Sequence, residues 1–338
     1  MFLIGLLSLA AVGGAAYAMS DVFVPDEAPE DDDNIDDQPD EISEGEFLEI
    51  DGTPVTAEPS FEDEEQSVET QISEVAGDLE TEDSDALAGQ DGEDQIDDQP
   101  EDSVIDGGDG NDILHGGDGA DTIAGGDGQD ILHGNAGEDH LAGNDGDDSL
   151  YGHSGADVLE GGDGADVLFG GQDDDTLTGG DRDDALHGGF GADTLHGGAG
   201  EDVLFGGEGD DHLTGADGDG EQARDFLNGG GGEDTILADS GDVVTGGDGA
   251  DDIILSPDDE DEAVTVMDFQ PGQDKLLISW DGQEDPDIQI ETDPDDENLT
   301  HVLVAGQDVA QLLGAEGLTA DDIQLITEAE LAQLSTLS

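Results

Sequence analysis

Aspartate residues recur every nine positions over a long stretch of this sequence. Residues 107–214 form 12 uninterrupted nonapeptides, in which position one is always Gly, position six is always Asp and position eight is always Leu or Ile. Carboxylates at a fixed spacing, together with the carbonyl groups of a glycine-rich backbone, supply the hard oxygen ligands that Ca²⁺ prefers, whereas Mg²⁺ requires a tighter octahedron and keeps more water. The spacing therefore predicts a series of calcium sites along the repeats.

The charge of the repeats agrees with about one divalent ion per repeat. Residues 107–214 carry 27 acidic residues and one Arg, a net charge of −26, and 12 divalent ions would contribute +24. Without ions the segment should be expanded, because one aliphatic side chain in nine residues cannot offset both this repulsion and the backbone entropy of so many glycines. Calcium binding is therefore expected to be coupled to folding.

The elements that must position these carboxylates follow from the repeat itself. Positions one to six are expected to form a turn and positions seven to nine a short strand. The residues that replace Gly at position two are Asn135, Asn144 and His153, types that tolerate a left-handed backbone. Position eight points inward and its neighbours outward. We expect two units per coil, stacked at about 4.8 Å, with two facing rows of aliphatic side chains.

The units are similar to the G-G-x-G-x-D-x-U-x consensus of the RTX, or hemolysin-type, calcium-binding repeats. The resemblance implies an all-β fold, a parallel β-roll (a right-handed β-solenoid), in which the position-six Asp side chains and turn carbonyls bind several Ca²⁺ ions. It also implies export by a type I system. The ligands that it implies are Asp112, Asp121, Asp130, Asp139, Asp148, Asp157, Asp166, Asp175, Asp184, Asp193, Asp202, Asp211, Asp234 and Asp251.

Some units depart from the consensus. The register extends backward over residues 80–106 in weaker units and forward to residue 254. Asp173 and Arg182 replace Gly at position four, and the unit that begins at Gly215 has 14 residues in place of nine. We expect the long unit to break the stacking and the calcium sites near these departures to be weakened or missing.

The rest of the chain divides into three parts around a β-roll at residues 80–255. Residues 1–19 are apolar and form a signal or membrane anchor, while residues 20–79 read as a disordered acidic linker. Ala16-Tyr17-Ala18 fits a signal-peptidase site, but no Lys or Arg precedes it, so a cleaved signal and a retained anchor both stay open. Such an apolar start is unlike typical type I substrates, which leaves the export route open.

Residues 258–338 are expected to form a small β-rich cap. A segment within it, Asp268 to Leu276, resembles the D-F-x-x-G-x-D-x-L sequence that follows such repeats in exported proteins. Thr319 is predicted to begin a short strand or helical turn, and Glu328–Leu334 has a short amphipathic helical pattern. The predicted strands are Val264–Phe269, Lys275–Trp280, Asp287–Glu291, His301–Ala305 and Val309–Leu313.

Composition and motifs exclude several functions. The 338 residues contain 95 Asp plus Glu against 3 Lys plus Arg, a net charge of −92, which repels nucleic acid and anionic membranes and favours cations as partners. Cys is absent, so disulfides and thiolate ligands are excluded. An EF-hand at Asp217 fails because Asn228 stands where a bidentate Glu is needed. We expect no enzyme, because neither H-E-x-x-H nor G-x-S-x-G occurs.

Six histidines occupy positions nine or seven of the repeats and should face outward from the strands: His115, His133, His140, His187, His196 and His212. They form either a polar strand surface without a site or a stripe that binds a transition metal.

The predicted function is calcium binding with calcium-induced folding of a protein that is secreted or displayed on the cell surface. The alternative is a surface adhesin or matrix protein that uses calcium as a structural staple, which a retained anchor at residues 1–19 would favour. A secreted hydrolase or toxin has less support, because no segment outside the repeats is long and apolar enough for a catalytic domain. Export machinery is a further expected partner.

Overall fold

The computed structural model describes residues 85–90, 92–97, 101–215, 223–256, 262–280, 286–327 and 329–331. All of them belong to one compact unit, Ala76–Ser338. The predicted apolar segment at 1–19 and the predicted acidic linker at 20–79 lie outside these residues. Among the described residues, no helix has the length and apolarity needed to cross a membrane.

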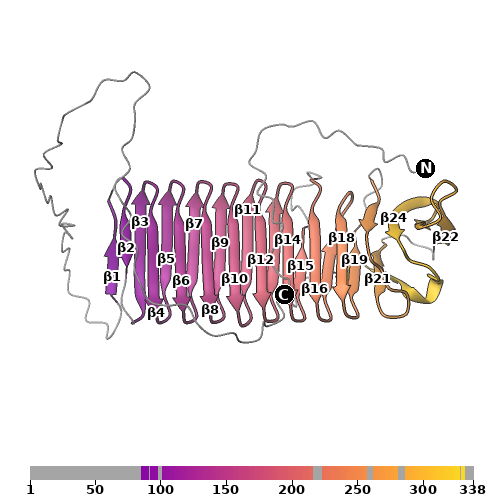
Figure 1. Cartoon of the computed structure of the whole chain (residues 1–338). Coiled ribbons are helices and arrows are strands. Elements are labelled where there is room, and N and C mark those ends of the chain that lie inside the picture. Colours follow the sequence, from indigo (N-terminus) through magenta and orange to yellow (C-terminus); the bar gives the residue numbers. More distant parts are fainter. Residues whose placement is uncertain are drawn as a thin grey trace, which may run out of the picture. The chain divides into compact units, whose positions relative to one another are not determined.

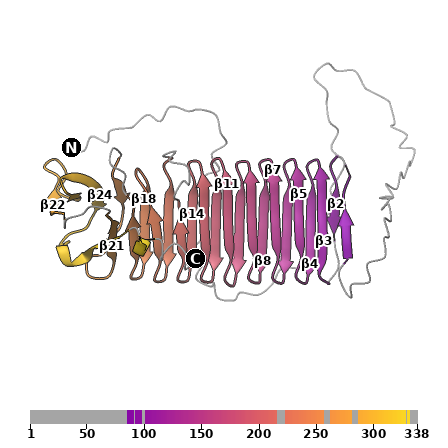
Figure 2. The same cartoon turned by 180° about the vertical axis from the view of Figure 1, so that it is seen from behind.

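The repeats form two stacked sheets of parallel strands, as Figures 1 and 2 show. Odd-numbered strands make one sheet and even-numbered strands the other, so successive units alternate between the sheets. Within the repeat array, Leu168 pairs with Leu186, a separation of 18 residues. Two nonapeptides therefore complete one coil, and the predicted all-β parallel β-roll is confirmed.

The odd-numbered strands of the array are β1 (Asp85–Ala88), β3 (Ser103–Asp109), β5 (Thr122–Asp127), β7 (His140–Asp145), β9 (Val158–Asp163), β11 (Thr176–Asp181), β13 (Thr194–Ala199), β15 (His212–Thr214), β17 (Thr235–Ala238) and β19 (Asp252–Leu255). The even-numbered strands are β2 (Gln95–Asp97), β4 (Ile113–Asp118), β6 (Ile131–Ala136), β8 (Ser149–Ser154), β10 (Val167–Gln172), β12 (Ala185–Phe190), β14 (Val203–Glu208), β16 (Phe226–Gly231) and β18 (Val243–Asp248).

The strands are longer than the sequence predicted. A typical strand such as β10 has six residues, from position seven of one unit to position three of the next. The prediction of a turn over positions one to six was therefore wrong, because the turn occupies only positions four to six. Position two still pairs between coils, as in Gly171 with Gly189. The pairing does not require glycine, because Asn135 pairs with His153 at the same position.

The backbone at position two is left-handed, as predicted. The φ angles are 81° at Asn135, 79° at Asn144 and 80° at His153. Asp173 and Arg182, the residues that replace Gly at position four, also take positive φ angles of 73° and 84°. The turn geometry therefore persists through both substitutions.

A thin core fills the space between the two sheets. The position-eight side chains, such as Leu159, Leu168 and Leu177, are fully buried. Each sheet contributes one row of these side chains, because strand residues alternate in direction and the flanking positions seven and nine face outward. No unit can bury its aliphatic side chain without neighbouring coils, which makes the array cooperative.

The 14-residue unit does not break the stacking, contrary to expectation. Leu204 of β14 pairs with Leu227 of β16, and Leu213 of β15 pairs with Ile236 of β17. The additional residues fall between positions one and six, in the turn, so the flanking strands keep their register. Residues 216–222 themselves lie outside the described part.

The C-terminal strands extend both sheets of the array. The odd sheet ends with β21 and β25, while the even sheet continues through β20, β24, β23 and β22. The last three pair antiparallel as a meander. Thr319 caps the short 3₁₀ helix η1, so it begins a helical turn. The bounds are β20 (Val264–Val266), β21 (Lys275–Ser279), β22 (Ile288–Thr292), β23 (Leu299–Val304), β24 (Gln307–Leu313), η1 (Ala320–Asp322) and β25 (Ile323–Ile326).

Candidate metal centre

The position-six aspartates form two ladders, one for each sheet. Each aspartate lies just before a strand, so every second unit adds a rung to the same ladder. The ladder beside the even strands contains Asp94, Asp112, Asp130, Asp148, Asp166, Asp184, Asp202, Asp225 and Asp242. The ladder beside the odd strands contains Asp121, Asp139, Asp157, Asp175, Asp193, Asp211, Asp234, Asp251 and Asp274.

One carboxylate oxygen of each rung is fixed by the backbone. The amide N–H of Asp157 donates to Oδ1 of Asp175, one coil further on, at 2.8 Å, and Asp175 donates in turn to Oδ1 of Asp193 at the same distance. These side chains are 1–2% exposed. The N–H donors hold each carboxylate in one orientation and leave Oδ2 available for another partner.

That second oxygen is buried without a hydrogen-bond partner in most rungs. A buried carboxylate oxygen without a donor is costly, so such an atom points to a missing ligand. The Oδ2 atoms concerned belong to Asp112, Asp130, Asp139, Asp148, Asp157, Asp166, Asp175, Asp184, Asp193, Asp211, Asp234 and Asp251.

The position-one glycine leaves the space that Oδ2 occupies. A Cβ atom on Gly161 would collide with Oδ2 of Asp166 and would lie 2.5 Å from the carbonyl oxygen of Gly179 in the next coil. The backbone of Gly161 is not left-handed, so its φ does not require glycine. Glycine is needed at position one because a carboxylate and a carbonyl oxygen converge there.

Burial is the largest cause of a raised pKa in the ladder carboxyls that follow, and the charge of neighbouring carboxylates raises it further in most of them. The hydrogen bonds from backbone N–H groups lower the pKa but do not cancel this rise. The pKa lies above its usual value of 3.8 in Asp112, Asp130, Asp166, Asp251 and Asp274. It is raised to about 6 in Asp139, Asp193 and Asp234, to about 7 in Asp148, Asp157 and Asp211, and to about 8 in Asp175 and Asp184.

This environment fits calcium. Carboxylate oxygens that accept no hydrogen bond lie beside backbone carbonyl oxygens, and Cys ligands are absent from the chain. A hard divalent cation prefers such oxygen ligands in a flexible arrangement. Bound calcium would supply the positive charge that lets successive carboxylates stay ionised at this spacing. The residues that would hold it are the ladder aspartates and the position-one carbonyl groups.

All 14 aspartates that the sequence singled out lie in the ladders, but the sequence missed four further rungs. Asp94 belongs to a weak unit, Asp225 follows the insertion, Asp242 belongs to a shortened unit and Asp274 lies in the cap. Each precedes a strand that begins with one outward residue and then an inward aliphatic one. A search for this local pattern, without the requirement of a nine-residue spacing, would have identified all four aspartates. Near Asp173 and Arg182 the rung hydrogen bonds keep their usual length of 2.7–2.8 Å.

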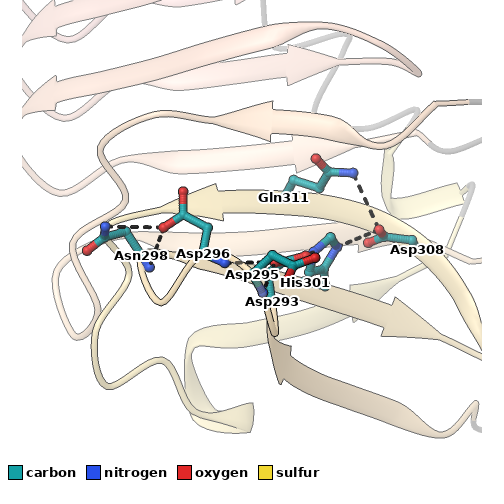
Figure 3. A network of polar contacts seen from close by, with 7 residues as sticks. All are labelled: Asp293, Asp295, Asp296, Asn298, His301, Asp308 and Gln311. Atoms are coloured by element: carbon teal, nitrogen blue, oxygen red, sulfur yellow. Dashed lines mark hydrogen bonds and ion pairs between the residues drawn. The ribbon is translucent and has the colours of Figure 1, made fainter. Parts of the chain in front are cut away.

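A separate polar cluster lies in the cap, shown in Figure 3. Nδ1 of His301 lies 2.7 Å from Oδ2 of Asp308, and its Nε2 lies 3.3 Å from Oδ2 of Asp293. Although burial opposes it, contact with these two carboxylates raises the pKa of His301. The backbone N–H groups of Asp295 and Asp296 donate to Oδ1 of Asp293. The imidazolium joins the β22–β23 turn to β24 and has no part in the ladders.

The outward histidines separate between the two sheets. His115, His133 and His187 lie on the even strands, in a row of stacked rings that continues through Tyr151 and Phe169. His140, His196 and His212 lie on the odd strands β7, β13 and β15. A single stripe of all six therefore does not form.

Comparison with known proteins identifies the repeats. A family described as RTX calcium-binding nonapeptide repeat (4 copies) matches the chain across residues 88–242. The individual matches cover residues 88–123, 106–141, 124–159, 133–168, 142–177, 178–213, 187–221 and 218–242. Residues 88–242 are therefore composed of RTX calcium-binding repeats.

A solved structure is also similar to part of the chain. It is the solution structure of the AlgE6R3 subunit from the Azotobacter vinelandii mannuronan C5-epimerase, with 23% identity, coverage of 45% of this chain and 77% of that one, and a TM-score of 0.20. No curated protein matches the sequence.

Proposed function

We propose that calcium folds the repeat array and that the chain is an exported protein whose folding is thereby confined to calcium-rich surroundings outside the cell. The observation that carries this proposal is the double ladder of buried carboxylates, each with one oxygen held by a backbone N–H and, in most rungs, the other without a hydrogen-bond partner. The role is binding and structural, with no catalytic step assigned.

The raised pKa values support the proposal that folding requires an ion at neutral pH. A carboxyl such as Asp184, with a pKa of about 8, is ionised in the unfolded chain and must take up a proton to be buried without a cation. Calcium relieves this cost by pairing with the ionised form. Extracellular calcium modules bind with dissociation constants of about 10⁻⁴ to 10⁻³ M, so such an array would stay unfolded in the cytosol and fold outside.

The test is far-UV circular dichroism of the chain in chelator, titrated with CaCl₂ and, in parallel, with MgCl₂. The expected result is a cooperative gain of β signal with calcium, reversed by chelator, and little response to magnesium. An array that is already folded in chelator at pH 7 would contradict the proposal.

A surface adhesin or matrix protein is the second candidate, favoured by the apolar residues 1–19, which are long enough to serve as a retained anchor. In that case calcium still stabilises the folded array, and only the location of the protein differs. Membrane fractionation of the producing cells, with mass spectrometry of the mature N-terminus, distinguishes the two. An N-terminus that begins after Ala18 excludes the anchor.

A further inference from the structure

Two histidines face each other on the outer surface of the even sheet. Nδ1 of His133, at position nine on β6, lies 3.0 Å from Nε2 of His153, at position two on β8. Neither residue belongs to the carboxylate ladders, and the contact crosses between neighbouring coils. It therefore exists only when the array is folded.

The backbone does not require histidine at residue 153. Its φ is 80°, and position two is Gly in nine of the 12 uninterrupted units. A left-handed conformation costs a residue with a Cβ about 1–2 kcal/mol. Asn135 and Asn144 show that asparagine satisfies the same geometry. An imidazole kept at a strained position, with its nitrogen aimed at a second imidazole, indicates a role for the ring itself.

Neighbouring rings hold His133 in place. Its ring stacks between His115, at a centroid distance of 4.6 Å, and Tyr151, at 4.8 Å, with interplanar angles of 8° and 16°. The ring orientation is thus set before any ligand arrives, which lowers the entropic cost of binding.

Both facing rings are neutral at pH 7. Burial and the nearby His115 and His153 lower the pKa of His133 to about 4, and burial and His115 lower the pKa of His153. One of the two facing nitrogens carries the proton of the hydrogen bond between the rings. In a neutral imidazole this proton can move to the other nitrogen of the same ring, which frees both facing lone pairs for a metal ion.

One ion can contact both nitrogens. With metal–nitrogen bonds of about 2.0 Å, two nitrogens 3.0 Å apart lie within reach of a single ion. Imidazole nitrogens bind Zn²⁺, Ni²⁺ and Cu²⁺, and Cu²⁺ binds most tightly of the divalent series.

We propose that His133 Nδ1 and His153 Nε2 form a Cu²⁺ site on the outside of the roll. Within the described residues no group of three or more His, Cys, Asp or Glu side chains is arranged to hold a metal. The site thus has two protein ligands, and its remaining positions are open to water or to a small external ligand. It differs from the calcium ladders in face, ligand type and preferred ion.

The test is a CuSO₄ titration of the full chain in saturating CaCl₂, which folds the array and occupies the carboxylates, followed by calorimetry and electron paramagnetic resonance. His153→Asn keeps the left-handed turn, as Asn144 does, and His133→Tyr keeps a stacked ring, as Tyr151 does. His187→Phe is the matched control, because it changes a ring of the same row between Phe169 and Phe205.

The wild type and His187→Phe are expected to bind one Cu²⁺ with hyperfine coupling to two imidazole nitrogens, and to bind Zn²⁺ more weakly. Even outer-shell partners of metal ligands contribute about 10- to 100-fold in affinity, so loss of either ligand should weaken binding at least about tenfold. Equal Cu²⁺ affinity in the wild type and His153→Asn, or Zn²⁺ bound more tightly than Cu²⁺, would overturn the proposal.

Discussion

Acid should fold the array in the absence of calcium. Thirteen ladder carboxyls, Asp157 among them, have folded-state pKa values above the usual 3.8, so the folded state binds more protons than the unfolded chain, and stability increases as the pH falls. The relevant window runs from about pH 8, the pKa of Asp175 and Asp184, down to about pH 5. In this window the unfolded chain and the exposed acidic residues remain largely ionised.

The size of the effect follows from the raised pKa values. A proton bound only by the folded state stabilises it by about 1.4 kcal/mol per pH unit. For Asp157, with a pKa of about 7, the gain between pH 7 and pH 5 is about 3 kcal/mol, which we reduce to about 1–2 kcal/mol because the turns border solvent. Over the eight carboxyls with pKa values of about 6 to 8, the gain is on the order of 10 kcal/mol, comparable to the whole stability of a domain.

The assay is far-UV circular dichroism in chelator between pH 8 and pH 5, with light scattering to detect precipitation as the pH approaches the pI of about 4.1. The expected result is a disordered spectrum at pH 8 and a reversible β spectrum at pH 5. Calcium added at pH 8 should give the same spectrum. A soluble chain that stays disordered at pH 5, or an array with equal β content at both pH values, refutes the reasoning.

Substitutions at four positions test other parts of the structure. Gly170→Ala places a Cβ against the carboxylate of Asp175 and should destabilise the calcium-bound roll by about 1–3 kcal/mol in thermal melts. Asp175→Asn should raise the calcium concentration needed for folding yet increase the β signal in chelator, since it removes a buried charge. Asn144→Ala should cost about 1 kcal/mol and Asn144→Gly almost nothing, as measured by denaturant titration. The pKa of His301 is raised by Asp308, so its contribution to stability is complete below pH 6.5 and lost as the pH rises through the raised pKa; His301→Gln should abolish that step in pH-dependent melts.

The nine-residue period predicted the register of two units per coil, and the resemblance to RTX repeats implied the parallel β-roll. Once position eight is aliphatic in every unit, only two units per coil bring those side chains together, so residues 18 apart had to pair. The left-handed backbone at Asn135 and Asn144 also followed from residue type, because few other residues with a Cβ tolerate it. These features depend on local chemistry that is repeated many times.

Features that depend on contacts between coils were not predicted. The strands extend into position three because the position-two residues of neighbouring coils pair, as Gly171 and Gly189 do and as Asn135 and His153 do. Asp225 was missed because the 14-residue unit places it outside position six, and Asp274 because it lies in the cap beyond the repeats, although both precede a strand as the other rungs do. The contact between His133 and His153 depends on side-chain direction at a left-handed residue, which the sequence does not specify.

The two ends of the sheets are protected by different means. Open edge strands recruit other chains, and short or charged strands discourage this. At the N-terminal end, β1 has four residues and β2 three, and each includes an aspartate. At the other end the even sheet changes from parallel to antiparallel pairing at β24, so its edge strand is β22 of the meander, which includes Glu291, and not a strand of the repeats. Oδ1 of Asp274, in the cap, accepts a hydrogen bond from the amide N–H of Asp251. The carboxylate ladder therefore extends into the cap. The cap therefore offers the last coil of the array a paired strand and a final carboxylate rung without a further repeat.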